Sequence, residues 1–152
     1  MTFPIFLDAN VPIYVAGQPH PLQKPCVDVL MLVARFPQAF VTDAEVLQEL
    51  LHRYRSRQLW PQGRQVVEDF ATLMLTHIEP VYPIDVMAAV ALADQYSRLS
   101  ARDLLHVAIM DRLGARQIVT ADRDFDEVEH ISRLDPADLP VWQDRIVGSG
   151  AS

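Results

Sequence analysis

Cysteine is almost absent from this chain, and long hydrophobic runs are missing altogether. Cys26 is the single cysteine in 152 residues, so no disulfide can form within the chain, and no zinc-type pairing of cysteine with histidine occurs. The apolar N-terminal stretch stops at Asp8 and has no basic segment before it. No later run approaches the roughly 18 apolar residues of a membrane span. These absences predict a cytoplasmic protein in which Cys26 is a small core residue.

Basic residues are also in short supply. The chain has 13 Lys and Arg against 20 Asp and Glu, which gives a formal net charge of −7. This balance argues against a protein that binds nucleic acid simply by coating phosphates with positive charge. A divalent metal changes the argument, because Mg²⁺ or Mn²⁺ held by several acids in one cleft offsets their repulsion and attracts phosphate.

Several signatures of other enzyme classes are missing. The sequence contains no nucleophile elbow, no Walker A loop and no dinucleotide-binding fingerprint, which disfavours Ser/His/Asp hydrolysis, P-loop phosphoryl transfer and NAD binding. His106 lies on an apolar helix face, and we interpret it as a hydrogen-bonded core residue rather than a base. The histidines are scattered without a zinc-like pair, at His20, His52, His77, His106 and His130.

The length and the hydrophobic fraction of 50% suit one domain with one core. We predict a single domain over residues 1–147 and a flexible tail over residues 148–152. Short apolar strands alternate with helical periodicity, which predicts a three-layer α/β/α fold around a central, mainly parallel sheet. Predicted strands are residues 4–8, 40–41, 78–81 (an edge strand, because it contains proline) and 117–120; predicted helices begin near Asn10 and cover 26–34, 42–56, 66–74, 84–98 and 100–113.

Local signals predict where some helices begin and end. Thr42 and Glu45 have the spacing of a capping box, as do Ser100 and Asp103, and Gly114 is placed to end the second of these helices. Residues 59–63 have the composition of a turn.

Acidic residues follow two of the predicted strands. Asp8 and Asp122 lie just past apolar strands, and ligands of open parallel sheets bind beyond the carboxyl ends of the strands. Asp103, in the first turn of one helix, and Glu49, in another, would join them if those helices flank the crevice. The four carboxylates have no obvious cationic partners in the sequence.

Each acid taken singly has a structural explanation. Asp8 and Asp122 suit turns or helix caps, Asp103 completes a capping box, and Glu49 suits a solvated helix surface. The combination is more informative, because hard divalent cations need several oxygen ligands, and two-metal nucleases hold their ions about 3.5–4 Å apart.

Four segments resemble the motifs of PIN-domain ribonucleases, in the same order and with similar spacing. The resemblance extends over roughly residues 3–140, and its two late motifs are the more specific ones. It implies the three-layer fold and a metal-dependent nuclease. The similar segments are residues 6–14, 42–51, 100–108 and 118–125.

The resemblance also implies roles for particular residues. Glu45 competes with Glu49 for the glutamate position, and we prefer Glu49 because Glu45 is assigned to the capping box. Asp124 would be an accessory ligand, while Asn10 and Thr120 would orient ligands or water. The implied catalytic and metal-binding quartet is Asp8, Glu49, Asp103 and Asp122.

Partners follow from the same resemblance. One or two Mg²⁺ or Mn²⁺ ions would activate water to attack an RNA phosphodiester. Stand-alone PIN domains of this length resemble the toxins of VapBC toxin–antitoxin pairs, which implies a homodimer and a cognate antitoxin. Helices 26–34 and 66–74 are candidates for a dimer face, although burial in the core explains them more simply.

Three arginines at the end of the helix that carries Glu49 would contact RNA or merely suit a solvated helix end: Arg53, Arg55 and Arg57.

Two other classes remain open. A non-catalytic PIN-like binding or scaffold protein would keep the fold without metal. A phosphoacceptor receiver domain also has acids at strand ends, but its adjacent N-terminal acids and its late lysine are absent, which strongly disfavours it.

Overall fold

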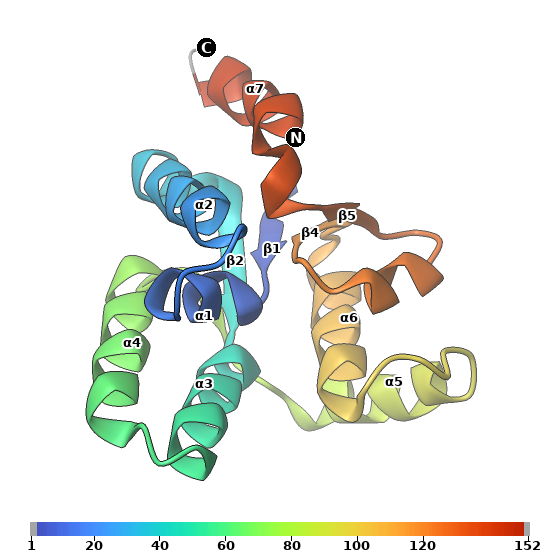
Figure 1. Cartoon of the computed structure of the whole chain (residues 1–152). Coiled ribbons are helices and arrows are strands. Elements are labelled where there is room, and N and C mark those ends of the chain that lie inside the picture. The colour runs from blue at the N-terminus through green and yellow to red at the C-terminus, as the bar shows by residue number, and fades with distance from the viewer. Residues whose placement is uncertain (1–2, 151–152) are drawn as a thin grey trace.

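A central sheet of five parallel strands organises the chain (Figure 1). The computed structural model describes residues 3–150. The strand order is β3-β2-β1-β4-β5, so β1 lies at the centre with β2 on one side and β4 on the other. The strands are β1 (Ile5–Leu7), β2 (Phe40–Asp43), β3 (Ile78–Glu79), β4 (Gln117–Val119) and β5 (Ser132–Leu134).

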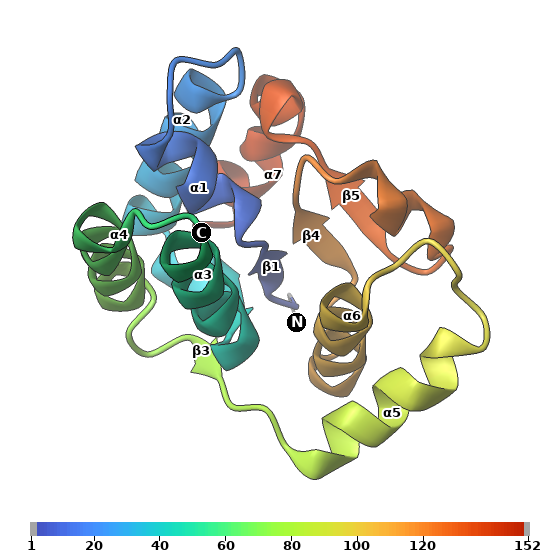
Figure 2. The ribbon, with the colours of Figure 1, turned by 60° about the horizontal axis from the view of Figure 1, so that its bottom comes forward.

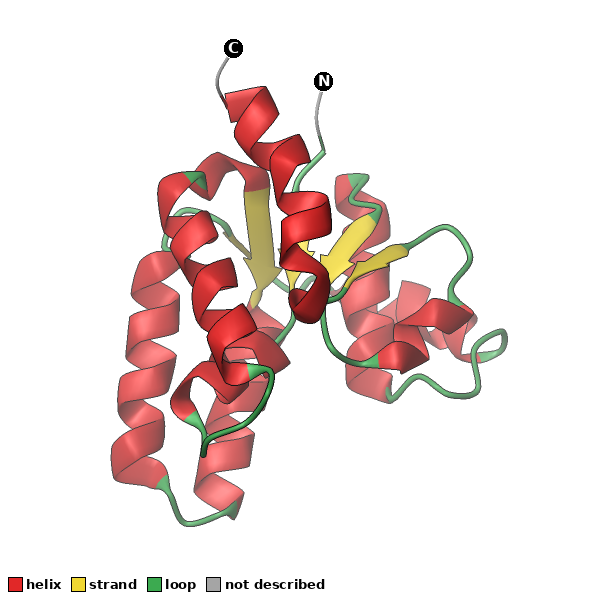
Figure 3. Ribbon diagram, turned by 45° about the horizontal axis from the view of Figure 1, so that its top comes forward, coloured by secondary structure: helices red, strands yellow, loops and turns green. Residues whose placement is uncertain are grey.

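Helices cover both faces of this sheet, as Figures 2 and 3 show from two further directions. Helices that follow one another in the chain pack together in pairs: α1 with α2, α3 with α4 and α5 with α6. The prediction of a three-layer α/β/α fold with a mainly parallel sheet is confirmed. The described helices are α1 (Asn10–Ala16), α2 (Gln23–Arg35), α3 (Ala44–Ser56), α4 (Trp60–Leu73), α5 (Pro83–Ala93), α6 (Ala101–Leu113) and α7 (Leu139–Gly150).

Burial on both faces explains why β1 is apolar throughout. All three residues of β1 are buried, as are the four residues of β2. A parallel strand covered by helices on both sides has no solvent face, so it lacks the alternation of polar and apolar residues. Phe6 pairs with Val41 on one side and Ile118 on the other, which places the middle of β1 in the core.

Several boundaries differ from the predictions. The turn predicted at residues 59–63 is wrong, because α4 already begins at Trp60 and Pro61 occupies its first turn, where a proline costs little. The helix predicted over 84–98 ends at Ala93. The strand β5 and the helix α7 were not predicted, because only one of the three residues of β5 is buried and the glycines of α7 suggested a tail.

The cap of α3 is also different from the prediction. Thr42 belongs to β2, and its hydroxyl donates to the carbonyl of Leu7 at 3.0 Å. The N-cap is Asp43, whose carboxylate accepts the amide hydrogen of Val46 at 2.9 Å. By contrast, Ser100 caps α6 as predicted, and Gly114 ends that helix in the left-handed conformation with φ 72°.

The predicted tail over residues 148–152 lies partly in α7, which extends to Gly150, while residues 151–152 fall outside the described part of the chain. Among the described helices, none combines the length and the apolar character that crossing a bilayer requires.

Gly63 allows α4 to approach α3 closely. A Cβ atom at this position would lie 2.2 Å from Cβ of Tyr54, an atom that is fixed to the backbone of α3. We predict that Gly63→Ala lowers the free energy of unfolding by about 1–3 kcal/mol through overpacking. Alanine is normally the better helix residue by about 1 kcal/mol, so the close contact reverses the usual sign. Urea denaturation measures this difference.

Gly148→Ala is the matched control for this substitution. Gly148 is in α7, and nothing lies within 4 Å of a Cβ added there. The control should keep or slightly raise stability. A Gly63→Ala variant as stable as the control would contradict the close approach of the two helices.

Candidate metal centre

Four acidic side chains meet in one pocket at the carboxyl edge of the sheet. Asp8 follows β1, Asp122 follows β4, and Asp103 lies in the first turn of α6. Glu49 comes from the middle of α3. The pocket has a volume of about 290 Å³, and its lining consists of Asp8, Asn10, Ile13, Tyr14, Glu49, Arg53, Asp103 and Asp122. The structure therefore brings together the four acids that the sequence analysis selected.

Hydrogen bonds hold Asp8 in a defined orientation. One carboxylate oxygen accepts from the amide of Ala9 at 2.8 Å, and the other accepts from the hydroxyl of Thr120 at 2.8 Å. The same hydroxyl accepts from the side-chain amide of Asn10 at 2.7 Å and from the backbone amide of Asp122 at 3.1 Å. Thr120 thus uses its one donor and both acceptor positions, and it ties the end of β1 to the end of β4.

Burial among like charges changes the acidity of two of these carboxyls. Burial, with a smaller contribution from the charge of Glu49, raises the pKa of Asp8 to about 6 despite the opposing charge of His106. The pKa of Asp103 is also raised, mainly by burial and then by Asp122 and Glu49. Clusters of carboxyl groups with raised pKa values are typical of sites that bind a cation.

A buried histidine and a buried aspartate complete the site, and the sequence analysis assigned neither to it. His106 is fully buried on α6, and its Nδ1 lies 2.7 Å from a carboxylate oxygen of Asp43. The interpretation of His106 as a hydrogen-bonded residue of the interior agrees with this contact. Its Nε2, however, faces the pocket acids, 3.7 Å from Glu49 and 4.0 Å from Asp8.

The charge on His106 follows from these neighbours. Burial alone would lower the pKa of the imidazole, but the carboxylates of Asp43, Glu49 and Asp8 outweigh it and raise the pKa to about 10. One signal for this pair was available in the sequence: Asp43 ends β2, so it lies at the same sheet edge as Asp8. The capping-box spacing assigned the cap of α3 to Thr42, and this concealed the role of Asp43.

The expectation that the acids lack cationic partners was wrong for Glu49. Arg102 lies 3.6 Å from Glu49, and together with His106 it lowers the pKa of that carboxyl against the opposing effect of burial. Arg102 also pairs with Glu45 at 3.4 Å. Within residues 3–150, Asp8, Asp103 and Asp122 have no ion pair with lysine or arginine.

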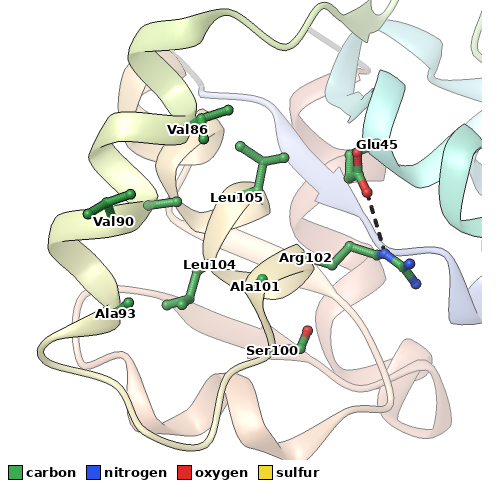
Figure 4. A pocket seen from close by; sticks show the side chains of 10 residues that line it. Glu45, Val86, Val90, Ala93, Ser100, Ala101, Arg102, Leu104 and Leu105 are labelled. Atoms are coloured by element: carbon green, nitrogen blue, oxygen red, sulfur yellow. Dashed lines mark ion pairs between the residues drawn. The ribbon is translucent and has the colours of Figure 1, made fainter.

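Glu45 faces a different cavity. It lines one side of a groove of about 650 Å³, and Val86, Val90 and Leu105 line the α5 and α6 side of the same groove (Figure 4). The dashed line in Figure 4 marks its ion pair with Arg102. The preference for Glu49 over Glu45 is thus supported by position, although the reason given for it, a capping role of Glu45, does not hold.

The remaining predicted residues differ in their positions. Asp124 is exposed and is not among the residues that line the pocket; its backbone amide donates to Asp122 at 3.0 Å. Arg53 lines the pocket and is half-buried, whereas Arg55 and Arg57 are exposed at the end of α3.

Two buried atoms at the centre of this site have no hydrogen-bond partner. They are Oε2 of Glu49 and Nε2 of His106, and they lie 3.7 Å apart. Buried polar atoms are almost always paired, so an unpaired acceptor among carboxylates is a position that a bound cation would satisfy. Carboxylate oxygens suit Mg²⁺ and Mn²⁺, and the residues present therefore fit a divalent cation.

An open parallel sheet with a carboxylate pocket at its carboxyl edge defines an α/β protein with an acidic metal centre. The model of one family, the PIN domain, matches residues 5–131. The chain belongs to the PIN domain family.

Curated relatives cover most of the chain. The protein named Ribonuclease VapC23, from Mycobacterium tuberculosis, is 40% identical over 121 residues, which are 78% of this chain and 92% of that protein. VapC ribonuclease Mb1869c, from Mycobacterium bovis, is 34% identical over 133 residues, covering 86% of this chain and 98% of that protein.

Solved structures share the fold at low sequence identity. VapBC2 from Rickettsia felis, bound to a DNA fragment from its promoter, aligns with a TM-score of 0.66 at 15% identity, over 86% of this chain and 97% of that one. FitAcB from Neisseria gonorrhoeae aligns with a TM-score of 0.63 at 19% identity, over 87% of this chain and 97% of that one.

The raised pKa of Asp8 predicts a pH-dependent stability difference in the metal-free protein. The pKa is about 6 when folded and 3.8 for an unperturbed aspartate, so the folded state binds more protons between these values. The contribution of Asp8 to stability is therefore present below pH 3.8 and is lost as the pH rises through 6. Asp8→Asn cannot undergo this loss.

With EDTA present, the free energy of unfolding of Asp8→Asn minus that of the wild type should increase from about pH 4 to about pH 7. Urea titrations at several pH values measure it. A difference that stays constant over this range would show that burial does not perturb this carboxyl.

Proposed function

We propose that this protein is a metal-dependent endoribonuclease that hydrolyses RNA phosphodiester bonds and acts as the toxin of a toxin–antitoxin pair. The observation that carries the proposal is the convergence of four carboxylates from four separate elements on one pocket. Relatives that are 34% and 40% identical carry the name ribonuclease, which supports the reaction and the substrate class.

The four pocket acids form the metal-binding and catalytic set. The structure supports this assignment with their shared lining of the pocket and with the unpaired Oε2 of Glu49. Asp124 would be an accessory residue, since it reaches the set only through Asp122. The members of the set are Asp8, Glu49, Asp103 and Asp122.

Asp8, Glu49, Asp103 and Asp122 would hold Mg²⁺ or Mn²⁺, which would supply an activated water for in-line attack on the phosphodiester and would stabilise the departing oxygen. The protein's own contribution is to hold the carboxylates in place. Thr120 and Asn10 fix the orientation of Asp8, and the backbone of β4 carries Asp122 to the same edge. The net negative charge of the chain makes the bound cation necessary for the approach of an RNA phosphate.

Arg53 is the arginine best placed to guide RNA. It lines the pocket beside the acids, whereas Arg55 and Arg57 extend from the exposed end of the same helix. A phosphate contact inside the pocket should affect affinity more than contacts at its margin.

Two protein partners are part of the proposal: a second copy of the chain and a cognate antitoxin. The antitoxin is supported by the solved neighbours VapBC2 and FitAcB, which share the fold over nearly their whole length. The homodimer is supported by α5, where Ile84 and Met87 are exposed by 69% and 65%, since clustered exposed apolar side chains mark protein interfaces. The predicted dimer helices α2 and α4 expose less apolar surface for such an interface, because Val29, Leu32 and Phe70 are buried in the core.

Light scattering of the purified chain tests the dimer, and co-purification with the product of the adjacent reading frame tests the antitoxin. We place the protein in the cytoplasm on the strength of its lone, buried thiol, which needs no oxidising compartment, and cell fractionation tests this.

RNA cleavage by variants of the pocket acids, compared with a matched glutamate control, tests the proposed reaction. Glu49→Gln and Asp103→Asn should lower the rate of Mg²⁺- or Mn²⁺-dependent cleavage by roughly a hundredfold, because each removes a metal ligand. Glu45→Gln is the control, since Glu45 lies one turn earlier on α3, contacts the same Arg102 and faces the other groove. It should retain nearly full activity.

An Asp103→Asn, Glu49→Gln double variant that still cleaves RNA in an EDTA-sensitive manner would refute the assignment. Calorimetry with Mn²⁺ separates the enzyme from a non-catalytic PIN-like scaffold, which would take up no metal at this pocket.

RNA affinity of two charge-reversal variants tests the role of Arg53. Arg53→Glu should weaken binding of a short RNA more than Arg57→Glu, and it should reduce the salt dependence of binding by about one counterion. Filter binding over a range of salt concentrations measures both quantities. Equal, small effects of the two substitutions would assign all three arginines to a solvated helix end.

A further inference from the structure

His106 has an unused ligand atom that points at the acids of the pocket. The side chain is fully buried, and its Nε2 is one of the two buried atoms without a hydrogen-bond partner. One oxygen of Asp8, one oxygen of Glu49 and one ring nitrogen of His106 all lie within 4.8 Å of one another. A buried imidazole nitrogen left open toward two carboxylates needs an explanation, because burial without a partner is costly.

The spacing of these atoms favours a shared cation over direct hydrogen bonds. Nε2 lies 3.7 Å from Oε2 of Glu49 and 4.0 Å from Oδ1 of Asp8, which exceeds hydrogen-bond length in both cases. Two ligand atoms on one small divalent ion, each about 2.1 Å from it, are at most about 4.2 Å apart. Both measured separations fall below that limit.

Asp43 sets the ring in the orientation and protonation form that a ligand requires. Its Oδ2 lies 2.7 Å from Nδ1, so Nδ1 keeps its proton. In the metal-free protein Nε2 is protonated as well, and a metal ion that binds there displaces that proton. A carboxylate behind a histidine is the usual arrangement around metal-binding imidazoles. The other oxygen, Oδ1, caps α3 through Val46 at 2.9 Å, which prevents the carboxylate from turning away.

We propose that His106 is a nitrogen ligand of the metal centre through Nε2, with Asp43 as its positioning residue. This inference rests on the proposed function and adds to it a metal preference. A site made only of carboxylates suits Mg²⁺, whereas an imidazole ligand favours first-row transition-metal ions, because Mg²⁺ prefers oxygen. The centre therefore selects an ion such as Mn²⁺ over Mg²⁺ by the identity of one buried side chain.

Pulsed electron paramagnetic resonance of the Mn²⁺-loaded chain tests this directly. Nitrogen bonded to Mn²⁺ modulates the electron spin echo, and ¹⁵N-labelled histidine assigns the modulation to an imidazole. The wild type should show this histidine coupling. His130→Gln is the control, because His130 pairs with Asp111 on the surface, and it should keep the coupling.

Two variants should abolish the coupling while Mn²⁺ still binds to the acids. His106→Gln removes the ligand. Asp43→Asn keeps the cap, since its oxygen stays with Val46, but it turns an amide N–H toward Nδ1. The proton then moves to Nε2 and blocks it. Each variant should weaken Mn²⁺ binding by about tenfold and change Mg²⁺ binding much less.

The possible results separate the two proposals. Mn²⁺ that binds to the wild type without histidine coupling overturns the nitrogen ligand and leaves the acidic nuclease centre intact. Failure of the wild type to bind Mn²⁺ or Mg²⁺ overturns both. Because the wild-type spectrum alone decides the first question, the test does not depend on whether the buried His106→Gln variant folds.

Discussion

Parallel pairing of β1 with β2 on one side and with β4 on the other is the constraint on which the site depends. The pairing of Phe6 with Val41 and Ile118 brings the carboxyl ends of three strands to one edge. The amide of Asp8 donates to the carbonyl of Val119 at 3.2 Å and extends this pairing past the end of β1. Neighbouring strand ends in a parallel sheet leave backbone and side-chain groups pointing into a common crevice, so the acids meet without any long loop.

Collecting carboxylates in a buried pocket has an electrostatic cost that the rest of the site offsets. Burial raises the pKa of Asp8 and Asp103, which means that the ionised forms are disfavoured there. In the metal-free protein His106 and Arg102, which both belong to α6, supply positive charge beside these acids. A divalent cation bound among these carboxylates would complete the balance and would attract a polyanion such as RNA.

Much of this architecture was predictable from local patterns. All of β1 and the last two residues of β4 are apolar and buried, so their sequences carry no competing polar signal. Ser100 and Gly114 set the ends of α6 through short-range hydrogen bonds and backbone conformation, which depend on neighbouring residues only. Elements with weak local signals were missed: β5 has one buried residue, Leu134, and exists because β4 pairs with it.

The amino-acid sequence is enough to predict the alternation of strands and helices, the parallel sheet and the strand-end acids Asp8 and Asp122, because hydrophobic periodicity and strand-end position are local properties. Only the tertiary structure shows that Glu49 rather than Glu45 enters the pocket. Both glutamates pair with Arg102, and the packing of α3 on α6 places Glu49 among the acids. The tertiary structure also decided that Asp43 and His106, 63 residues apart, meet behind the acids. Such a contact depends on how β2 and α6 pack together, which neither local sequence specifies.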